Sequence, residues 1–359
     1  VSTTPKENSS SEKGCTQENE QEKFTKYFSF EWSSSYYPTI VMDPAKQIRE
    51  NKLKSRDLVL AYIERLAIVN KTVNGLTQNN TEALAQAEIP FTVKANIKVK
   101  GFITSACNLY TMHNPPSTED APVIKRLKAA GAIILGITSM PNNGVSWAVD
   151  DSACGIVNNP HDTRRMSGGS TGGEGVLVSS AGSLFGIGND IGGSIMANKP
   201  LNYYEKELDF NKLKVFYLED LNVLISEVLH DEQRNVVRMV KNFFEAKHQL
   251  NPLTDLPGLF KLVYSGKANE TFVQLELSML QSFAKPKDLK EENFVASKKQ
   301  KLRDQLNKLL GNNGILLLPI WPTPPPYHHM EPFTPWNVMY TILFNVLGFP
   351  ALSVPEYNL

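Results

Sequence analysis

Hydrophobic positions recur every three to four residues from Ser55 to Val69, which is the spacing of one face of an α-helix. We expect Ser55 to cap the N-terminus of this helix, with Asp57 in the first turn. The apolar face consists of Leu58, Tyr62, Leu66 and Val69. The pattern therefore predicts an amphipathic helix packed against a core.

Two apolar stretches farther along predict buried strands. The first, Phe91–Lys94, is short and β-branched and ends on a lysine. The second, Ala132–Thr138, follows a predicted helix at Glu119–Ala130 that Gly131 ends. A helix followed by a buried strand is typical of α/β proteins.

The last third of the chain shows the same mixture. Helical periodicity covers Asn235–Leu250 and Ser297–Leu310, and Ile315–Leu318 reads as a strand that Pro319 stops. The longest apolar stretch, Val338–Val354, contains asparagine, glycine and proline. It therefore predicts a buried helix and turn rather than a membrane span.

Composition favours a globular protein without affinity for nucleic acid. The chain has 359 residues, of which 41% are hydrophobic and 21% charged, enough for a large core. Its 37 basic and 37 acidic residues balance, so no basic surface for nucleic acid is expected. Residues 1–37 are predicted to be a disordered N-terminal segment, and residues 1–27 lack the apolar core of a signal peptide.

Cysteine usage predicts a reducing, intracellular location. Cys15, Cys107 and Cys154 are too few and too scattered for a disulfide framework, and no Cys-x-x-Cys pair occurs. We expect a cytoplasmic or peripherally membrane-associated protein. Four glycosylation sequons are frequent enough by chance not to change that expectation; they begin at Asn8, Asn70, Asn79 and Asn269.

The candidate chemistry lies between Ser167 and Ile195, where glycine and serine are unusually dense. Two Gly-Gly-Ser triplets end at Ser170 and Ser194. A serine preceded by glycines can be exposed on a sharp turn, with backbone N–H groups aimed at a developing oxyanion. Apolar blocks between the triplets argue against a solvated linker. The absence of a Gly-Lys-Ser/Thr ending argues against a nucleotide-binding loop.

These motifs resemble the amidase signature family. The segments that carry the resemblance are Gly168–Gly175 (GGSTGGEG), Gly186–Ser194 (GIGNDIGGS) and Pro90–Lys94 (PFTVK). A weaker resemblance covers roughly residues 38 to 355, and the pattern of Gly314–Pro355 is most similar to the fatty-acid amide hydrolase 2 branch. The resemblance implies an α/β amidase-signature fold, in which helices cover both faces of a mixed central β-sheet.

The resemblance also implies a Ser-Ser-Lys triad without metal or organic cofactor. Ser194 is the implied nucleophile, and Ser170, which follows a predicted cis peptide, passes its proton to Lys94. Lys94 must then be neutral near physiological pH, although a free lysine titrates near ~10.4. Burial can lower a lysine pKa by up to roughly 3–5 units. By itself, a lysine at a strand end is usually solvated, so this role depends on the PFTVK match.

The remaining implied site residues surround the two serines. Backbone N–H groups of Ile191, Gly192 and Gly193, together with that of Ser194, would form the oxyanion hole. Thr171 and Asp190 would support Ser170 and the loop. The chain departs from the family pattern at Thr171, at Asn189 in place of threonine or serine, and at Met196 in place of arginine.

The family pattern also shapes the expected organisation and partners. Residues 38–359 are predicted to form a single amidase-like domain that lacks segments near 80–90, near 197–209 and after 359. We expect a serine hydrolase that cleaves small or fatty-acyl carboxylic amides through an acyl-enzyme. Peripheral membrane contact, for which Asn251–Lys267 is a candidate, and a homodimer are left open. One alternative is a catalytically inactive amidase-like binding protein. Another, part of an amidotransferase working on charged tRNA, is disfavoured by the C-terminal pattern.

Overall fold

The computed structural model describes residue 44 and residues 46–86, 89–190, 192–194, 213–219, 227–245, 250–252 and 289–351. The main helices are α3 (Ser55–Val73), α4 (Ala83–Gln86), α5 (Pro122–Ala129), α6 (Gly172–Ser179), α7 (Asp231–Glu245), α10 (Leu289–Leu310) and α11 (Met339–Leu347). The strands are β1 (Leu76–Asn79), β2 (Ile89–Lys94), β3 (Ala132–Thr138), β4 (Gly186–Ile187), β5 (Lys214–Tyr217), β6 (Leu250–Pro252) and β7 (Gly314–Leu317). Short 3₁₀ helices lie at Thr111–His113, Asn142–Gly144, Glu331–Phe333 and Pro335–Val338. The expected disorder of residues 1–37 concerns a segment outside these ranges.

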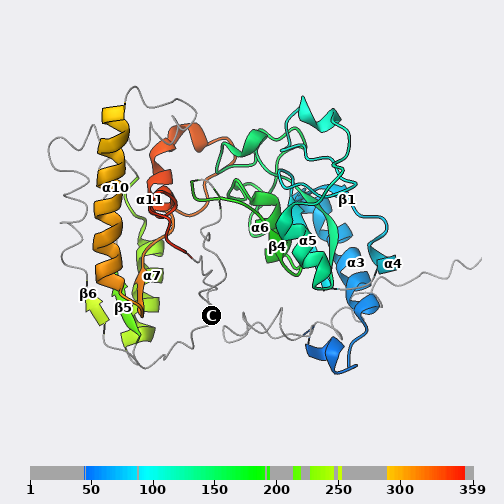
Figure 1. Cartoon of the computed structure of the whole chain (residues 1–359), viewed down its shortest axis with the longest axis horizontal. Coiled ribbons are helices and arrows are strands. Elements are labelled where there is room, and N and C mark those ends of the chain that lie inside the picture. The colour runs from blue at the N-terminus through cyan, green and yellow to red at the C-terminus, as the bar shows by residue number, and fades with distance from the viewer. Residues whose placement is uncertain are drawn as a thin grey trace, which may run out of the picture.

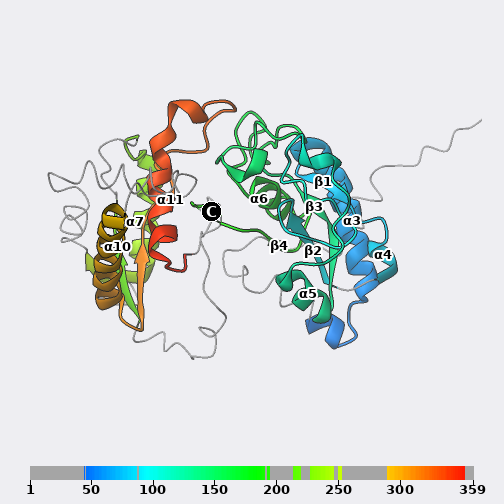
Figure 2. The same ribbon diagram turned by 45° about the horizontal axis from the view of Figure 1, so that its top comes forward.

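The N-terminal half of the described chain is built on a mixed sheet with strand order β1-β3-β2-β4. Strand β1 runs antiparallel to β3, whereas β3, β2 and β4 are parallel. Helices α3 and α6 cover one face of this sheet, and α5 covers the other (Figure 2). The predicted α/β fold, with helices on both faces of a mixed sheet, is confirmed.

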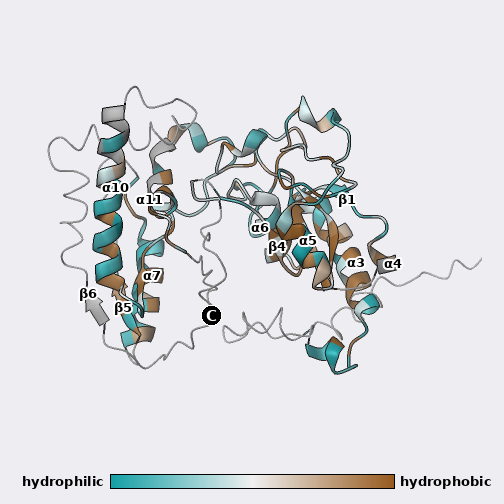
Figure 3. Ribbon diagram, viewed as in Figure 1, coloured by the Kyte–Doolittle hydropathy of each residue, from teal (hydrophilic) through white to brown (hydrophobic). Residues whose placement is uncertain are grey.

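Strand alternation divides the residues of β2 between the two faces. Phe91 and Val93 are fully buried in the core on the α5 side, with Ile124 and Ile134. The core on the other side joins α3 to α6. Figure 3 shows hydrophobic residues gathered where these helices meet the sheet. Thr92 and Lys94 therefore point away from the α5 core, toward α6.

The described C-terminal residues form a second, parallel sheet of order β6-β5-β7. Helix α7 packs on this sheet, and α10 packs on α11 through Leu302, Leu306, Phe344 and Leu347. Figure 1 shows these elements on one side of the molecule and the first sheet on the other. The strands described here are thus divided between two sheets.

Polar contacts connect the two halves. The carboxylate of Asp150 lies 2.7 Å from Nδ1 of His328 and accepts the His329 N–H at 2.7 Å. Ser146 donates to Glu331 at 2.5 Å. Helix α11 is attached to the loop that follows β4 by contacts described below. Through α11, residues far apart in the sequence therefore meet beside the second Gly-Gly-Ser triplet.

Two element boundaries differ from the sequence-based expectation. The N-cap residue of α3 is Lys54 rather than Ser55, because the backbone is still extended at Lys54 and already helical at Ser55. The Lys54 side chain makes no capping hydrogen bond. The helix expected at Asn235–Leu250 spans Asp231–Glu245. Leu250 instead pairs with Val215 in the second sheet, a non-local interaction that helical periodicity does not reveal.

The other predicted elements are found with modest shifts. The strand at Ala132–Thr138 has the expected bounds, and the helix and turn expected within Val338–Val354 are α11 and its C-cap Gly348, whose φ of 67° suits glycine. Cys107 and Cys154 are free thiols. Within the described ranges, no helix has both the length and the apolar character needed to cross a membrane.

Candidate active site

Lys94 is the last residue of strand β2, and its side chain lies in the protein interior. The side chain is fully buried, at 0% exposure. Its Nζ donates to Oγ of Ser170 at 2.7 Å, to Oγ1 of Thr171 at 2.9 Å and to the carbonyl oxygen of Asn189 at 3.1 Å. Three oxygen acceptors around one buried amine match the three donors of an ammonium.

The first glycine-rich triplet brings Ser170 to this amine. The Gly169–Ser170 peptide is cis, as expected from the sequence, and Ser170 is 3% exposed. Helix α6 begins directly afterwards, and its second residue, Gly173, packs on backbone. A Cβ at Gly173 would lie 2.5 Å from both the nitrogen and the oxygen of Ser139. Glycine therefore lets the start of α6 approach the end of β3 and places Ser170 beside Lys94.

The second triplet places Ser194 against Ser170. The two Oγ atoms lie 2.5 Å apart, and the Ser170 N–H donates to Oγ of Ser194 at 3.2 Å. A continuous hydrogen-bonded path thus runs from Ser194 through Ser170 to Lys94. The structure brings together all three residues that the sequence singled out as a triad.

Burial lowers the pKa of Lys94 from 10.5 to about 8. Desolvation is the largest cause, because a buried ammonium loses its hydration. The carboxylates of Asp190 and then Glu174 oppose this effect by stabilising the charged form. A sizeable fraction of neutral lysine is therefore present near neutral pH, as general base catalysis requires.

The expected oxyanion loop is only partly within the described residues, since Ile191 lies outside them, as does Met196, the departure from the family pattern. Gly193 has φ of 129°, a conformation that favours glycine. Its N–H donates to Oδ1 of Asp190 at 2.6 Å, and the Gly192 carbonyl accepts from Oγ1 of Thr341 at 3.0 Å. Asp190 thus holds the turn before Ser194 by accepting the Gly193 N–H, so in this structure that N–H, expected in the oxyanion hole, is directed at a carboxylate instead.

Thr171 and Asn189 occupy the far side of the amine. Thr171 was expected to support Ser170, but its hydroxyl contacts Lys94 directly. The Asn189 carbonyl accepts from Lys94, and its side chain exchanges two hydrogen bonds with Asn96, at 3.0 and 3.1 Å. Because the backbone of Asn189 makes the contact with Lys94, the departure from threonine or serine at this position leaves that contact intact.

Sequence reasoning missed Glu174, which is 5% exposed behind Lys94. Its carboxyl oxygens pair with Thr92 at 2.5 Å and Thr138 at 3.0 Å. Desolvation raises the pKa of Glu174 to about 8. The signal for a buried Glu174 was its position between glycines, just before the apolar residues of α6. A glutamate on the surface would not need such neighbours.

Among the described histidines, His328 has a carboxylate partner, Asp150. Its Nε2 lies 3.2 Å from the Thr163 carbonyl oxygen. Both ring nitrogens are therefore engaged away from Ser170 and Ser194. Among the described residues, the hydrogen-bond partners of Ser170 and Ser194 include no histidine.

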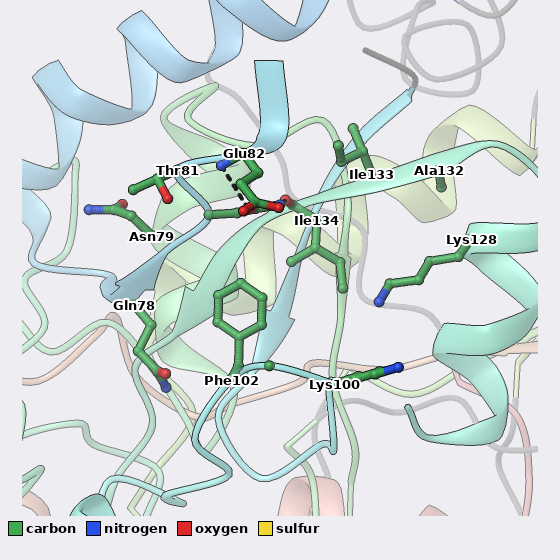
Figure 4. A pocket seen from close by; sticks show the side chains of 12 residues that line it. Gln78, Asn79, Thr81, Glu82, Lys100, Phe102, Lys128, Ala132, Ile133 and Ile134 are labelled. Carbon is green, nitrogen blue, oxygen red and sulfur yellow. Dashed lines mark hydrogen bonds between the residues drawn. The ribbon is translucent and has the colours of Figure 1, made fainter. Parts of the chain in front are cut away.

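A polar cavity of about 620 Å³ lies elsewhere, beside β1 and β3 (Figure 4). Its lining includes Lys100, Lys128 and Glu82, and Lys128 pairs with Asp120 at 2.9 Å. The charges there are largely balanced. Neither serine nor Lys94 lines this cavity, so it is separate from the candidate active site.

The comparisons with known proteins agree with this geometry. Residues 57–197, which contain the whole candidate triad, match the family model named Amidase. Over this segment the chain is thus similar to the amidase signature family, and amide hydrolases are among its relatives. Among its relatives, fatty-acid amide hydrolase 2-A of Danio rerio is 25% identical over 88% of this chain and 81% of its own length.

Two further comparisons match less of the chain or share only the fold. Vitamin D3 hydroxylase-associated protein of Gallus gallus is 30% identical, but over 43% of this chain and 36% of its own length. A solved structure of a fatty acid amide hydrolase superposes with a TM-score of 0.69 and 18% identity, covering 91% of this chain and 75% of that one. The resemblance to the fatty-acid amide hydrolase 2 branch, expected from the C-terminal pattern, is confirmed.

Proposed function

We propose that this chain hydrolyses carboxylic amides through an acyl-enzyme on Ser194, with Ser170 and Lys94 as its proton-transfer path. The observation that carries the proposal is the unbroken path from Ser194 Oγ to Ser170 Oγ, 2.5 Å, and from there to Lys94 Nζ, 2.7 Å. A serine hydroxyl needs a neighbouring base before it can attack a carbonyl. Lys94 is the base that supports this step, because burial favours its neutral form.

The proposed acylation moves two protons and forms one bond. Neutral Lys94 takes the proton of Ser170 while Ser170 takes that of Ser194, and Ser194 Oγ attacks the amide carbonyl carbon. The carbonyl oxygen becomes an oxyanion. Ser170 then gives a proton to the amide nitrogen and regains one from Lys94, the C–N bond breaks, and a neutral amine leaves. Protonation of the nitrogen is needed because an amide anion is a very poor leaving group.

Deacylation repeats the sequence with water. Lys94, acting through Ser170, removes a proton from the water that attacks the ester on Ser194. Lys94 then returns this proton through Ser170 to Ser194 Oγ as the acyl C–O bond breaks, so the carboxylic acid leaves and the Ser194 hydroxyl is restored. No metal enters this scheme, and within the described residues no group of three or more His, Cys, Asp and Glu side chains could hold one.

A fatty-acyl amide is the substrate class that the relatives support, since the curated relative matching 88% of the chain is a fatty-acid amide hydrolase. Peripheral membrane contact and a homodimer stay predictions. The segment Asn251–Lys267, proposed from sequence to touch a membrane, has only residues 251 and 252 within the described ranges.

A fluorophosphonate probe tests the nucleophile. We expect the probe to label the wild-type chain at Ser194, to leave Ser194→Ala unlabelled, and to label Ser179→Ala normally, since Ser179 lies on the exposed side of α6. Labelling should be read by intact mass and by peptide mapping. Probe attached to Ser194→Ala at the wild-type level would disprove the nucleophile. An unlabelled wild type that also hydrolyses no oleamide or aryl amide would favour the inactive binding protein.

The pH dependence tests the base. Because Lys94 must be neutral and its pKa is lowered to about 8, kcat/KM should rise about tenfold per pH unit below that value and level off above it. The sign follows from the amine acting in its deprotonated form. Initial rates with an uncharged aryl amide between pH 5.5 and about 9.5 would measure this limb. A rate that is already level at acidic pH would contradict a lysine base.

A further inference from the structure

We propose that Asn345 and Thr341 on α11 are positioning residues that hold the turn carrying Ser194. The inference rests on the proposed function, which makes that turn the catalytic loop. The two residues are four positions apart, so they lie on the same face of the helix. That face meets the loop between Asp190 and Ser194, which is about 150 residues earlier in the chain.

Thr341 provides the first contact. Its Oγ1 lies 3.0 Å from the Gly192 carbonyl oxygen and 3.0 Å from the Val338 carbonyl oxygen, so its single hydroxyl hydrogen is shared between loop and helix. A Cβ at Gly193 would overlap the same Oγ1. The hydroxyl therefore lies close to the Gly193 backbone, and no side chain fits there between the loop and α11.

Asn345 provides the second contact through Asp190. Its Nδ2 donates to Oδ1 of Asp190 at 2.6 Å, and the same oxygen accepts the Gly193 N–H at 2.6 Å. The direction of the Gly193 N–H thus depends on where Asp190 sits, and Asp190 is held from α11. Helix α11 therefore fixes the orientation of the peptide next to Ser194, although no atom of α11 takes part in the proposed reaction.

The remaining polar atom of Asn345 adds no stabilising hydrogen bond within the described residues, because its Oδ1 is buried there without a partner. A buried unpaired amide oxygen is unfavourable for folding. An apolar residue of similar size would avoid this cost, so we expect Asn345→Leu to keep the fold while losing the donor to Asp190.

The experiment compares two variants at each position with a matched control. Asn345→Leu and Asn345→Asp remove the donor, Thr341→Val removes the hydroxyl, and Thr341→Ser keeps it. Asn337→Leu is the control, because Asn337 is 1% exposed and its Nδ2 also donates to a carboxylate, that of Glu227, at 2.5 Å. Asn337 lies on the same C-terminal segment and makes no contact with the Ser194 turn in the described structure.

We expect kcat for an amide to fall by about 10- to 100-fold in Asn345→Leu and Thr341→Val, with little change in KM, because the nucleophile and the loop N–H groups lose alignment. Thr341→Ser should restore kcat. Asn337→Leu should retain it. Equal losses in Asn337→Leu and Asn345→Leu, or an unchanged kcat in Asn345→Leu, would overturn the inference.

A second measurement separates this inference from the proposed function. Hydrogen–deuterium exchange of the peptide covering residues 186–194 needs no turnover. If α11 holds the loop, exchange there accelerates in Asn345→Leu and not in Asn337→Leu. Accelerated exchange in a protein without Ser194-dependent hydrolysis would support the holding role and reject the proposed function. Unchanged exchange in Asn345→Leu would reject the holding role itself.

Discussion

Replacing Lys94 by methionine is expected to lower kcat/KM for amide hydrolysis by about 10²–10⁴-fold, the range that a positioned general base contributes. Lys94 is fully buried and its Nζ donates a hydrogen bond to Ser170. The methionine side chain removes this amine and fills much of the space of the lysine methylene groups. Steady-state kinetics at pH 9 would measure the loss, since wild-type Lys94, with a pKa of about 8, is mostly neutral there.

The control for this variant is Lys98→Met, four residues later. Lys98 is exposed, at 61%, and its Nζ lies 3.6 Å from a carboxylate oxygen of Glu119 in a surface ion pair. We expect it to keep wild-type kcat/KM. Thermal unfolding should show both proteins folded, because methionine fills the Lys94 site without a charge to bury. Retention of full activity in Lys94→Met would require another base.

Gly173→Ala is expected to lower the free energy of unfolding by about 1–3 kcal/mol through overpacking. The new Cβ would meet the Ser139 backbone at 2.5 Å and the Gly75 carbonyl oxygen at 2.6 Å, and backbone cannot rotate out of the way as a side chain can. Urea denaturation would measure the change. Activity should fall as well, because α6 follows directly on Ser170.

The matched control lies two residues along the same helix. A Cβ at Gly175 meets nothing within 4 Å. Gly175→Ala should therefore raise the free energy of unfolding by about 0.4–1 kcal/mol, since alanine favours the helix and restricts the unfolded chain. Equal destabilisation by the two substitutions would show that contact with Ser139 is not the reason for glycine at Gly173.

Local sequence patterns predicted the elements of the N-terminal half well. Ala132–Thr138 is apolar at most positions and became a strand buried throughout. Ser55–Val69 showed its apolar face, and α3 buries those residues. Boundaries were less accurate where distant residues decide them. Leu250 was predicted to be helical but lies in β6, because its backbone pairs with that of Val215 in β5.

The sequence predicted which residues meet at the candidate site through its resemblance to the amidase signature family, which the two Gly-Gly-Ser triplets and Pro90–Lys94 carry. Local chemistry explained the glycines, because glycine is needed where the backbone turns sharply or packs closely, but by itself it did not connect Lys94 with the serines. Only the tertiary structure decided the surroundings of these residues. The burial of Glu174 behind Lys94 and the contact of Asn345 with Asp190 join residues that are distant in the sequence. Such contacts leave no periodic pattern, since they arise from how helices pack on sheets rather than from neighbouring residues.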